Sequence, residues 1–452
     1  MTVVLTLSCL TGCAAAAESS ASKGGKDSES AFDLRGAAIL GELLGLESET
    51  PDEEEAVTPA DPSDIKIGVS LWADDDPLAR QTIALIDRAA SLLGVEVQYA
   101  FCDQDSRRIR RSVSDLIDAG CDGILLANRT DSDIAAAIRL CDEKGVYLAQ
   151  LTHWINEERY PETYALAQAS PYYVGAVHGE ERTASYRLVT TLLEAGDRNI
   201  GYITWSESDT TQFERHTGYH MATEAFQRAY PTAEVRFAEP VEAATAEEGY
   251  RALKQMMEDD PELEAVVVSG GGGEVLDGVL AAVSEMGLVG VVNVAAFDAT
   301  DSMRPLLTSG AVYAAASGTY CQGLYGFLLV LDAARGTYVK ETGQIGADFS
   351  IADLFMLTST NARNYDDSFV NDQPYTNREI RALADLTVPE LKKSYWALTL
   401  TDVLDRHAKE TFEFPSLSGL LSSDDEEEEQ TQEEKIEEEQ AQEAKAAVED
   451  QA

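Results

Sequence analysis

Nine polar or aromatic side chains follow short apolar runs of this sequence and could contact a small polar molecule. Carboxylates accept hydrogen bonds from hydroxyl groups, and flat aromatic faces cover the apolar faces of ring-shaped ligands. This combination favours noncovalent recognition of a hydroxyl-rich ligand in a mostly apolar cleft. The nine candidate contact residues are Trp72, Asp76, Asp103, His153, Trp154, Phe213, Arg215, Asp298 and Tyr320.

Several of these candidates also have a purely structural interpretation. Asp76 could cap the helix that follows it, and Arg215 could brace a turn at Gly218. His153 could be a hydrogen-bonded interior histidine, and Trp154 could pack at the edge of a cleft without contacting a ligand.

The sequence offers little support for catalysis or for a cofactor. Gly270–Gly273 could direct backbone N–H groups at an anion, but the Lys-Ser or Lys-Thr of a phosphate-binding loop does not follow, so a close-approach turn is favoured. We find no Ser-His-Asp order, Gly-x-Ser-x-Gly elbow or zinc-ligand spacing. The cysteines at 102, 121, 141 and 321 are expected to be small buried hydrophobes rather than disulfides. We therefore expect a protein that is not an enzyme and that has no cofactor or metal.

The segment from Gly120 to Gly145 shows the elements that must position these side chains. Ile124–Ala127 is a short continuous apolar run, typical of a parallel strand covered on both faces. A polar loop follows, and apolar residues then recur at helical spacing from Ile134 to Cys141. Repetition at intervals of roughly 30 residues predicts an α/β fold with doubly wound parallel sheets, whose ligands bind at the carboxyl ends of the strands.

The same pattern predicts the remaining elements. The predicted strands are Ile65–Leu71, Val95–Phe101, Ile124–Ala127, Val146–Leu151, Asn199–Thr204, Glu234–Phe237, Ala265–Val268 and Val291–Ala296. The predicted helices include Leu78–Leu93, Ile109–Ala119, Val174–Ala195, Glu379–Asp385 and Leu391–His407.

Four loop motifs resemble those of the type I periplasmic binding proteins, the ribose- and galactose-binding group. They stand in the family's order between about Asp64 and Asn361, as Asp75-Asp76-Pro77, Asn128–Asp133, Arg215–Tyr219 and Ala296-Phe297-Asp298. The resemblance implies two doubly wound lobes joined by three hinge crossings, here near Ser170, Ser317 and Phe349, with a ligand clamped by lobe closure. It also implies ligand contacts at Asp76 and Asp298.

Three positions depart from the pentose-binding pattern of that family. Phe213, Gly272 and Ser317 stand where those members carry arginine, asparagine and glutamine, so ribose is not assumed as the ligand. A roomier, more aromatic pocket would suit another sugar, a cyclitol or a nucleoside.

The expected domain organisation has six parts. They are a signal peptide and lipobox at 1–13, a disordered tether at 14–63, an N-terminal lobe at 64–170 plus 318–349, a C-terminal lobe at 171–317 plus 350–361, a C-terminal extension at 362–421 and an acidic low-complexity tail at 422–452.

The first residues resemble the start of a bacterial lipoprotein. The apolar segment Val3–Leu10 is followed by Thr11-Gly12-Cys13, which predicts lipidation of Cys13. An ordinary terminus with a chance cysteine is the alternative, because no Lys or Arg precedes the apolar segment.

Charge and resemblance together define the expected function. The formal net charge of −47 argues against nucleic acid or an anionic membrane surface as a partner. We expect an extracytoplasmic, lipid-anchored monomer that captures a small polar ligand, such as a sugar or polyol, for an ABC permease. The alternative is a ligand-sensing subunit of a membrane histidine kinase or chemoreceptor.

Overall fold

A computed structural model describes residues 59–103, 105–206, 209–270, 273–298, 302–351, 355–371 and 373–394. The predicted lipidation site at Cys13, nearly all of the predicted tether and the acidic tail lie outside these residues.

The first lobe is built around a six-stranded parallel sheet in the order β12-β5-β4-β3-β1-β2. Its strands are β1 (Lys66–Leu71), β2 (Glu96–Phe101), β3 (Gly123–Leu126), β4 (Tyr147–Leu151), β5 (Tyr173–Gly179) and β12 (Ala347–Ile351). Two helices that contact each other, α2 (Pro77–Leu93) and α11 (Gln322–Arg335), cover one face. The other face carries α3 (Ser106–Asp118), α4 (Asp131–Lys144) and α5 (Pro161–Ala169). A short η1 (Pro62–Asp64) precedes β1.

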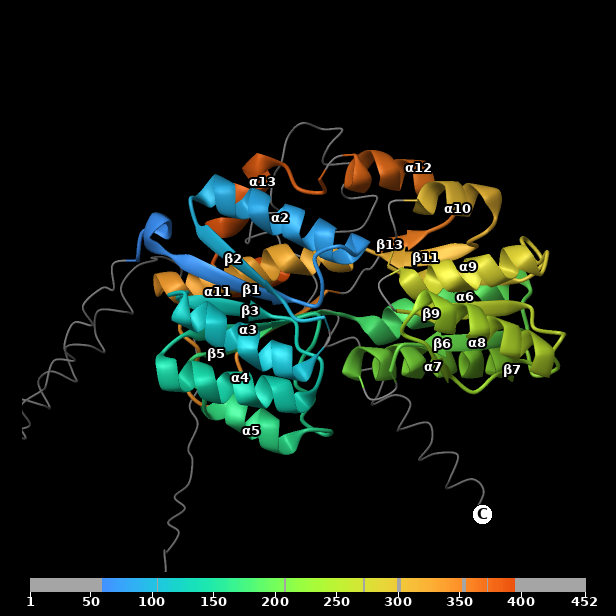
Figure 1. Cartoon of the computed structure of the whole chain (residues 1–452), viewed down its shortest axis with the longest axis horizontal. Helices are drawn as coiled ribbons and strands as arrows, with labels where there is room; N and C mark the ends of the chain where they lie inside the picture. Colours follow the sequence, from blue (N-terminus) through green and yellow to red (C-terminus); the bar gives the residue numbers. More distant parts are fainter. Residues whose placement is uncertain are drawn as a thin grey trace, which may run out of the picture. The chain divides into compact units, whose positions relative to one another are not determined.

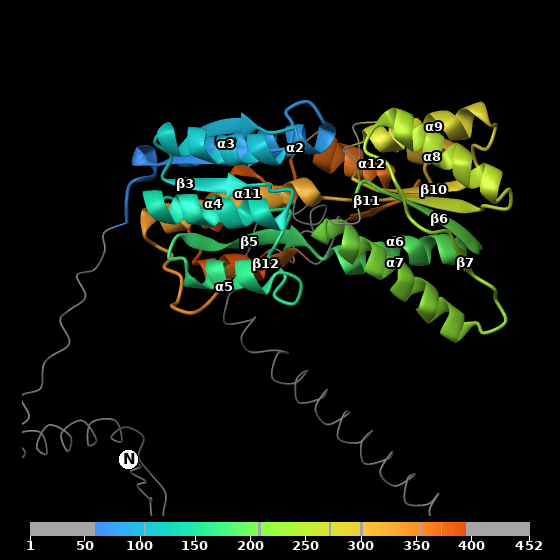
Figure 2. The same cartoon turned by 60° about the horizontal axis from the view of Figure 1, so that its bottom comes forward.

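The second lobe contains a sheet in the order β13-β11-β10-β9-β6-β7, with β8 pairing the end of β6. Only β13, at the edge, is antiparallel to its neighbour. The strands are β6 (Asn199–Thr204), β7 (Arg236–Phe237), β8 (Val241–Glu242), β9 (Ala265–Ser269), β10 (Asn293–Phe297), β11 (Ala314–Ser317) and β13 (Phe355–Leu357). Figure 2 shows α6 (Glu181–Ala195) and α7 (Thr210–Ala229) on one side of this sheet, opposite α8 (Ala246–Asp259) and α9 (Glu274–Glu285). Met303–Ser309 forms α10.

Local sequence signals explain where the helices of the first lobe begin and end. The Asp76 carboxylate accepts a hydrogen bond from the Ala79 N–H and so caps α2, whose first residue is Pro77. Gly94 and Gly145 end α2 and α4 in the left-handed conformation that glycine adopts without steric cost. The predicted α/β fold with two doubly wound sheets is confirmed.

One predicted helix is wrong. Residues 174–195 do not form one helix: Tyr173–Gly179 is the strand β5, paired with β4 and β12, and only Glu181–Ala195 is helical. The first crossing between the lobes therefore follows β5 near Gly179, and not Ser170. The Ser170 hydroxyl instead accepts hydrogen bonds from two backbone N–H groups at the turn that starts β5.

The other two crossings lie near the predicted positions. The chain returns to the first lobe between β11 and α11, through η2 (Thr319–Cys321). It leaves again after β12, before β13 joins the second sheet.

The C-terminal extension packs against both lobes. Its elements are α12 (Ala362–Tyr365), η3 (Asp366–Val370), α13 (Asn377–Ala384) and α14 (Val388–Ser394). Figure 1 shows α13 beside α2 of the first lobe and α12 beside α10 of the second. Arg304 of α10 forms an ion pair with Asp366 at 3.3 Å. The predicted helix at 379–385 is confirmed, whereas most of the helix predicted at 391–407 lies beyond the described residues.

The described part of the chain contains four cysteines, and all are buried thiols, as predicted. In this part of the chain no helix combines the length and the apolar character that a membrane crossing requires.

Candidate ligand-binding site

Polar side chains from both lobes meet where the strands of the two sheets end. A cavity of about 340 Å³ lies there, lined by the loops after β3 and β4 and by Thr210 at the start of α7. Three non-glycine residues of the described chain have positive φ, and each directly follows or nearly follows a strand: Asp103, Thr152 and Asp298. Such conformations cost about 1–3 kcal/mol and persist where surrounding structure imposes them.

His153 and Asp209 form an ion pair between the lobes. The His153 Nε2–H donates to Asp209 Oδ2 at 2.7 Å, with side-chain exposures of 16% and 2%. Asp209 also caps α7 by accepting from the Gln212 N–H. The backbone carbonyl of Thr152 accepts a second interlobe hydrogen bond, from the Thr211 hydroxyl at 3.2 Å.

The hydrogen bonds of His153 are those of a protonated imidazole. The Thr152 hydroxyl donates to the Leu151 carbonyl, so its oxygen can accept from His153 Nδ1–H at 3.0 Å. Burial lowers the pKa of His153, but the charge of Asp209 and the hydrogen bond between them outweigh burial and raise it. Burial acts to raise the pKa of Asp209, and the His153 charge brings it below its ordinary value.

Asp76 caps α2 at the end of the loop after β1, and Asp298 directly follows β10, so one lies on each lobe. Burial raises the pKa of Asp76 and the charge of Asp298 adds to this, against the opposing hydrogen bonds from Ala79 and Trp72. Trp72 donates its indole N–H to Asp76. Asp298 Oδ1 accepts from the Thr319 hydroxyl at 2.9 Å.

Arg215 is part of a buried ion pair rather than a brace for a turn. Its Nε donates to Glu181 Oε2 at 2.6 Å, both side chains are less than 5% exposed, and its guanidinium lies over the Phe297 ring. Burial acts to lower the pKa of Arg215, but the charges of Glu181 and Asp298 raise it. Gly218 lies inside α7, where an added Cβ would come within 2.1 Å of a carbonyl oxygen of α6. The predicted turn at Gly218 is therefore wrong. Gly218 instead permits close packing of α7 against α6.

A family model for the periplasmic binding protein domain matches residues 67–337. The chain belongs to this family. A search among curated protein sequences finds no match.

Solved structures of periplasmic binding proteins share the fold at low sequence identity. A solute-binding protein of an ABC transporter from Actinobacillus succinogenes, with bound D-allose, is 12% identical, with a TM-score of 0.57 over 67% of this chain and 100% of that one. One from Bacillus halodurans, with bound myo-inositol, is 19% identical, with a TM-score of 0.54 over 68% and 99%. A glucose-galactose binding protein from Geobacillus stearothermophilus is 16% identical, with a TM-score of 0.54 over 66% and 98%.

Among the predicted contact residues of this periplasmic binding protein, His153 and Trp154 both line the cavity between the lobes. The Trp154 ring is also stacked on His178 of β5, with 4.2 Å between ring centroids. This contact supports the packing interpretation of Trp154, although the residue also lines the cavity.

The structure places three other predicted residues less favourably. Asp103 is largely exposed and paired with Arg108. Phe213 is 42% exposed and carries the Arg159 guanidinium on its ring, 4.3 Å from the centroid. Tyr320 is buried in a hydrophobic core that contains residues of α2, of α11 and of the second lobe.

Sequence reasoning missed several polar residues of the site. Asp209 and Glu181 supply the charges that hold His153 and Arg215. Asn128 lines the cavity, and its Oδ1 accepts from Gln150 Nε2 at 2.8 Å. Asn128 is a polar residue after the apolar run of β3. The same signal identified the nine candidate contact residues and could have identified Asn128. The partners of His153 and Arg215 lie 56 and 34 residues away and carry no local signal.

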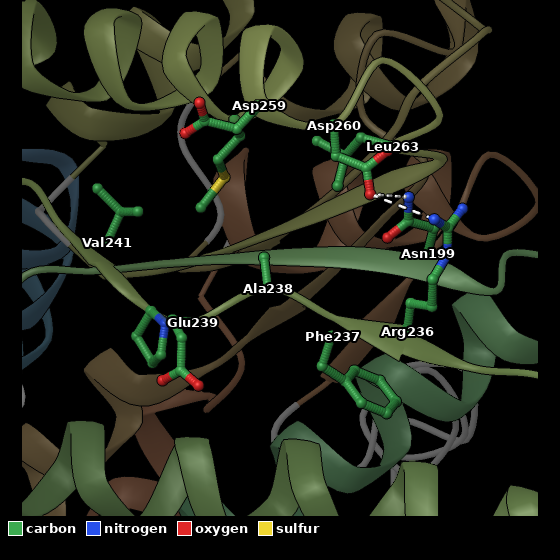
Figure 3. A pocket seen from close by; sticks show the side chains of 11 residues that line it. Asn199, Arg236, Phe237, Ala238, Glu239, Val241, Asp259, Asp260 and Leu263 are labelled. Carbon is green, nitrogen blue, oxygen red and sulfur yellow. Dashed lines mark hydrogen bonds and ion pairs between the residues drawn. The ribbon is translucent and has the colours of Figure 1, made fainter.

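A larger cavity, of about 610 Å³, lies on the second lobe between α8 and the segment that joins β7 to β8 (Figure 3). Asn199 and Arg236 line it, and each is the first residue of its strand. Ligands of open α/β sheets bind at the other, carboxyl ends of the strands. The smaller cavity between the lobes is therefore the candidate ligand site.

Proposed function

We propose that this protein captures a small, uncharged, hydroxyl-rich ligand, such as a sugar or polyol, by closing its two lobes. The observation that carries the proposal is the cavity of about 340 Å³ between the lobes, lined by Asn128 and His153 from one lobe and Thr210 from the other. We propose that Asp76 and Asp298, one on each lobe, add ligand contacts. Two carboxylates across a gap accept hydrogen bonds from ligand hydroxyls. The relatives solved with D-allose and myo-inositol support this ligand class.

Capture by closure needs no covalent step. The ligand site is formed by residues of both lobes, so it is complete only when the lobes are together. The interlobe contacts at His153 and Thr152 stabilise this arrangement. We further propose that the protein works outside the cytoplasm, anchored by lipid at Cys13, and delivers its ligand to an ABC importer.

The test is a binding screen with the full-length protein. Thermal shift and then titration calorimetry against monosaccharides, cyclitols and nucleosides are expected to identify a ligand. Asp76→Asn and Asp298→Asn are expected to weaken its binding by at least about 10-fold each, because each loses a charge-assisted hydrogen bond of about 1.5–3 kcal/mol. Asp115→Asn is the matched control, since Asp115 is an exposed residue of α3 that forms a surface ion pair with Arg111. No binding to any compound, or equal losses in the control, would contradict the proposal.

The importer is tested separately from the ligand. Membranes containing the candidate permease are expected to retain the protein more strongly with ligand than without it. Retention by a membrane histidine kinase instead would assign the protein to ligand sensing.

A further inference from the structure

Two histidines face each other on the surface of α7 in the second lobe. His216 and His220 are one helical turn apart, and their Nε2 atoms lie 3.0 Å from each other. His220 is exposed and His216 is partly exposed. The Nε2 atoms therefore converge at a surface that water reaches.

Aromatic side chains hold this pair in place from below. The His216 ring lies 5.3 Å from the Tyr202 ring, and the His220 ring lies 5.3 Å from Tyr219. Phe237 packs edge-on against Tyr219. The rings are therefore supported on the side that faces the sheet and open on the other.

Burial and two neighbouring charged groups affect the pKa of His216. Burial lowers the pKa of His216, and a positive charge on His220 would lower it further, while Glu239 acts in the opposite direction. Metal ions bind the uncharged form of imidazole. Glu239 lies in the segment between β7 and β8. In Figure 3 the Glu239 carboxylate lies below the strand that crosses the middle of the view, and Asp259 lies above it.

We propose that His216 and His220 form a two-nitrogen binding site for a divalent transition-metal ion of the Zn²⁺, Ni²⁺ and Cu²⁺ class. Two metal–nitrogen bonds of about 2.0–2.1 Å place their nitrogens about 2.9 Å apart at a right angle and about 3.3 Å apart at a tetrahedral angle. The observed 3.0 Å lies within that range. Histidines four residues apart on one helix face are a recurrent zinc-binding arrangement.

Water completes the coordination in this proposal. Among the described residues, no group of three His, Cys, Asp or Glu side chains is placed to hold a metal ion. The two imidazoles thus supply two ligands to the ion, and Glu239 contributes a negative charge nearby. A site with imidazole ligands selects the later transition metals over Mg²⁺ and Ca²⁺, which prefer oxygen.

The test uses the full chain and each metal alone. Titration calorimetry with ZnCl₂, NiCl₂ and CuSO₄ at neutral pH compares the wild type with His216→Gln/His220→Gln, and Thr217→Ala is the control from the same turn. The acidic tail is present in every variant, so any cation that it binds is common to all of them. We expect one ion per chain that the double variant binds at least about 10-fold more weakly, and whose affinity Thr217→Ala leaves unchanged.

Spectroscopy of the wild type keeps the test independent of whether variants fold. Bound Cu²⁺ is expected to show electron paramagnetic resonance couplings to imidazole nitrogen, and acid is expected to release the ion as the histidines protonate. Equal affinity and stoichiometry in the double variant, or a Cu²⁺ spectrum without nitrogen couplings, would show that the histidines only share a proton and would overturn the proposal. Failure to find a sugar ligand would leave these outcomes unaffected.

Discussion

The ion pair between His153 and Asp209 is expected to couple the two lobes energetically. Its hydrogen bond of 2.7 Å is charge-assisted, and both side chains are largely removed from solvent. Hydrogen bonds to charged groups contribute about 1.5–3 kcal/mol. A double-mutant cycle of His153→Gln, Asp209→Asn and the combined variant should give a coupling free energy in that range. Asn at position 209 keeps the cap of α7, so the cycle isolates the charge.

The pH dependence of this coupling has a defined sign. The pKa of His153 is raised in the folded protein, so its contribution is complete below the unfolded pKa of about 6.5 and is lost as pH rises through the raised value. The lowered pKa of Asp209 means that its contribution is present above the unfolded value of about 3.9 and is lost in acid. Stability should therefore decline on the alkaline side in the wild type and not in Asp209→Asn.

Urea unfolding of the four proteins at about pH 6 and about pH 9 measures both effects. We expect the larger coupling at the lower pH. A coupling below about 0.5 kcal/mol at pH 6 is within the range of independent sites, and it would refute the reasoning. So would a coupling that does not fall at pH 9.

Three further changes are expected to alter the free energy of unfolding, measured by denaturant titration. Arg215→Met should destabilise by about 3–5 kcal/mol, because it leaves the Glu181 charge buried without its partner. Burial raises the pKa of Asp332 to about 6, so the wild type loses stability as pH rises from about 4 to 6; Asp332→Asn should flatten that profile and add about 1–3 kcal/mol at pH 7. Gly175→Ala should cost at least about 1–3 kcal/mol, because its Cβ would lie 2.0 Å from a backbone oxygen of β12. Gly120→Ala, at a positive φ with open space around it, should cost less and serves as the control for backbone conformation.

The order of elements was predictable wherever apolar runs and helical periods alternate cleanly. The buried run of β3 and the capped helix α4 show both signals within 26 residues, and the structure confirms them. The strand β5 was predicted as helix, and this prediction was wrong. Its two valines are three residues apart, a helical spacing that matches the apolar residues of α6 that follow. Pairing with β4 and β12 decides that Tyr173–Gly179 is extended, and this pairing is not visible locally. The alanines of β11 likewise have low strand propensity and are extended only because β10 and β13 flank them.

The candidate site was predictable as a position more than as a set of interactions. Loops after the strands of a parallel sheet meet at one edge of that sheet, which is why Asp76 and His153 follow strands at one edge of the first sheet and Asp298 follows a strand at the corresponding edge of the second. The sequence could not show that Phe213 would stay exposed or that Arg215 would be neutralised by Glu181. Such outcomes depend on packing between elements that lie far apart in the sequence, such as α6 and α7, which no local pattern encodes.

Charged side chains of the two lobes predict which ligands favour closure. His153 and Asp209 attract, whereas Asp76 and Asp298 repel, since the charge of Asp298 raises the pKa of Asp76. Ligand hydroxyls that donate to both carboxylates offset the repulsion, but a ligand carboxylate would add a third negative charge. A neutral sugar should therefore bind at least about 10-fold more tightly than its uronic acid, corresponding to about 1.4 kcal/mol. Asp298→Asn should narrow that ratio, and an acid that binds as tightly as its parent sugar would show that these carboxylates do not face the ligand.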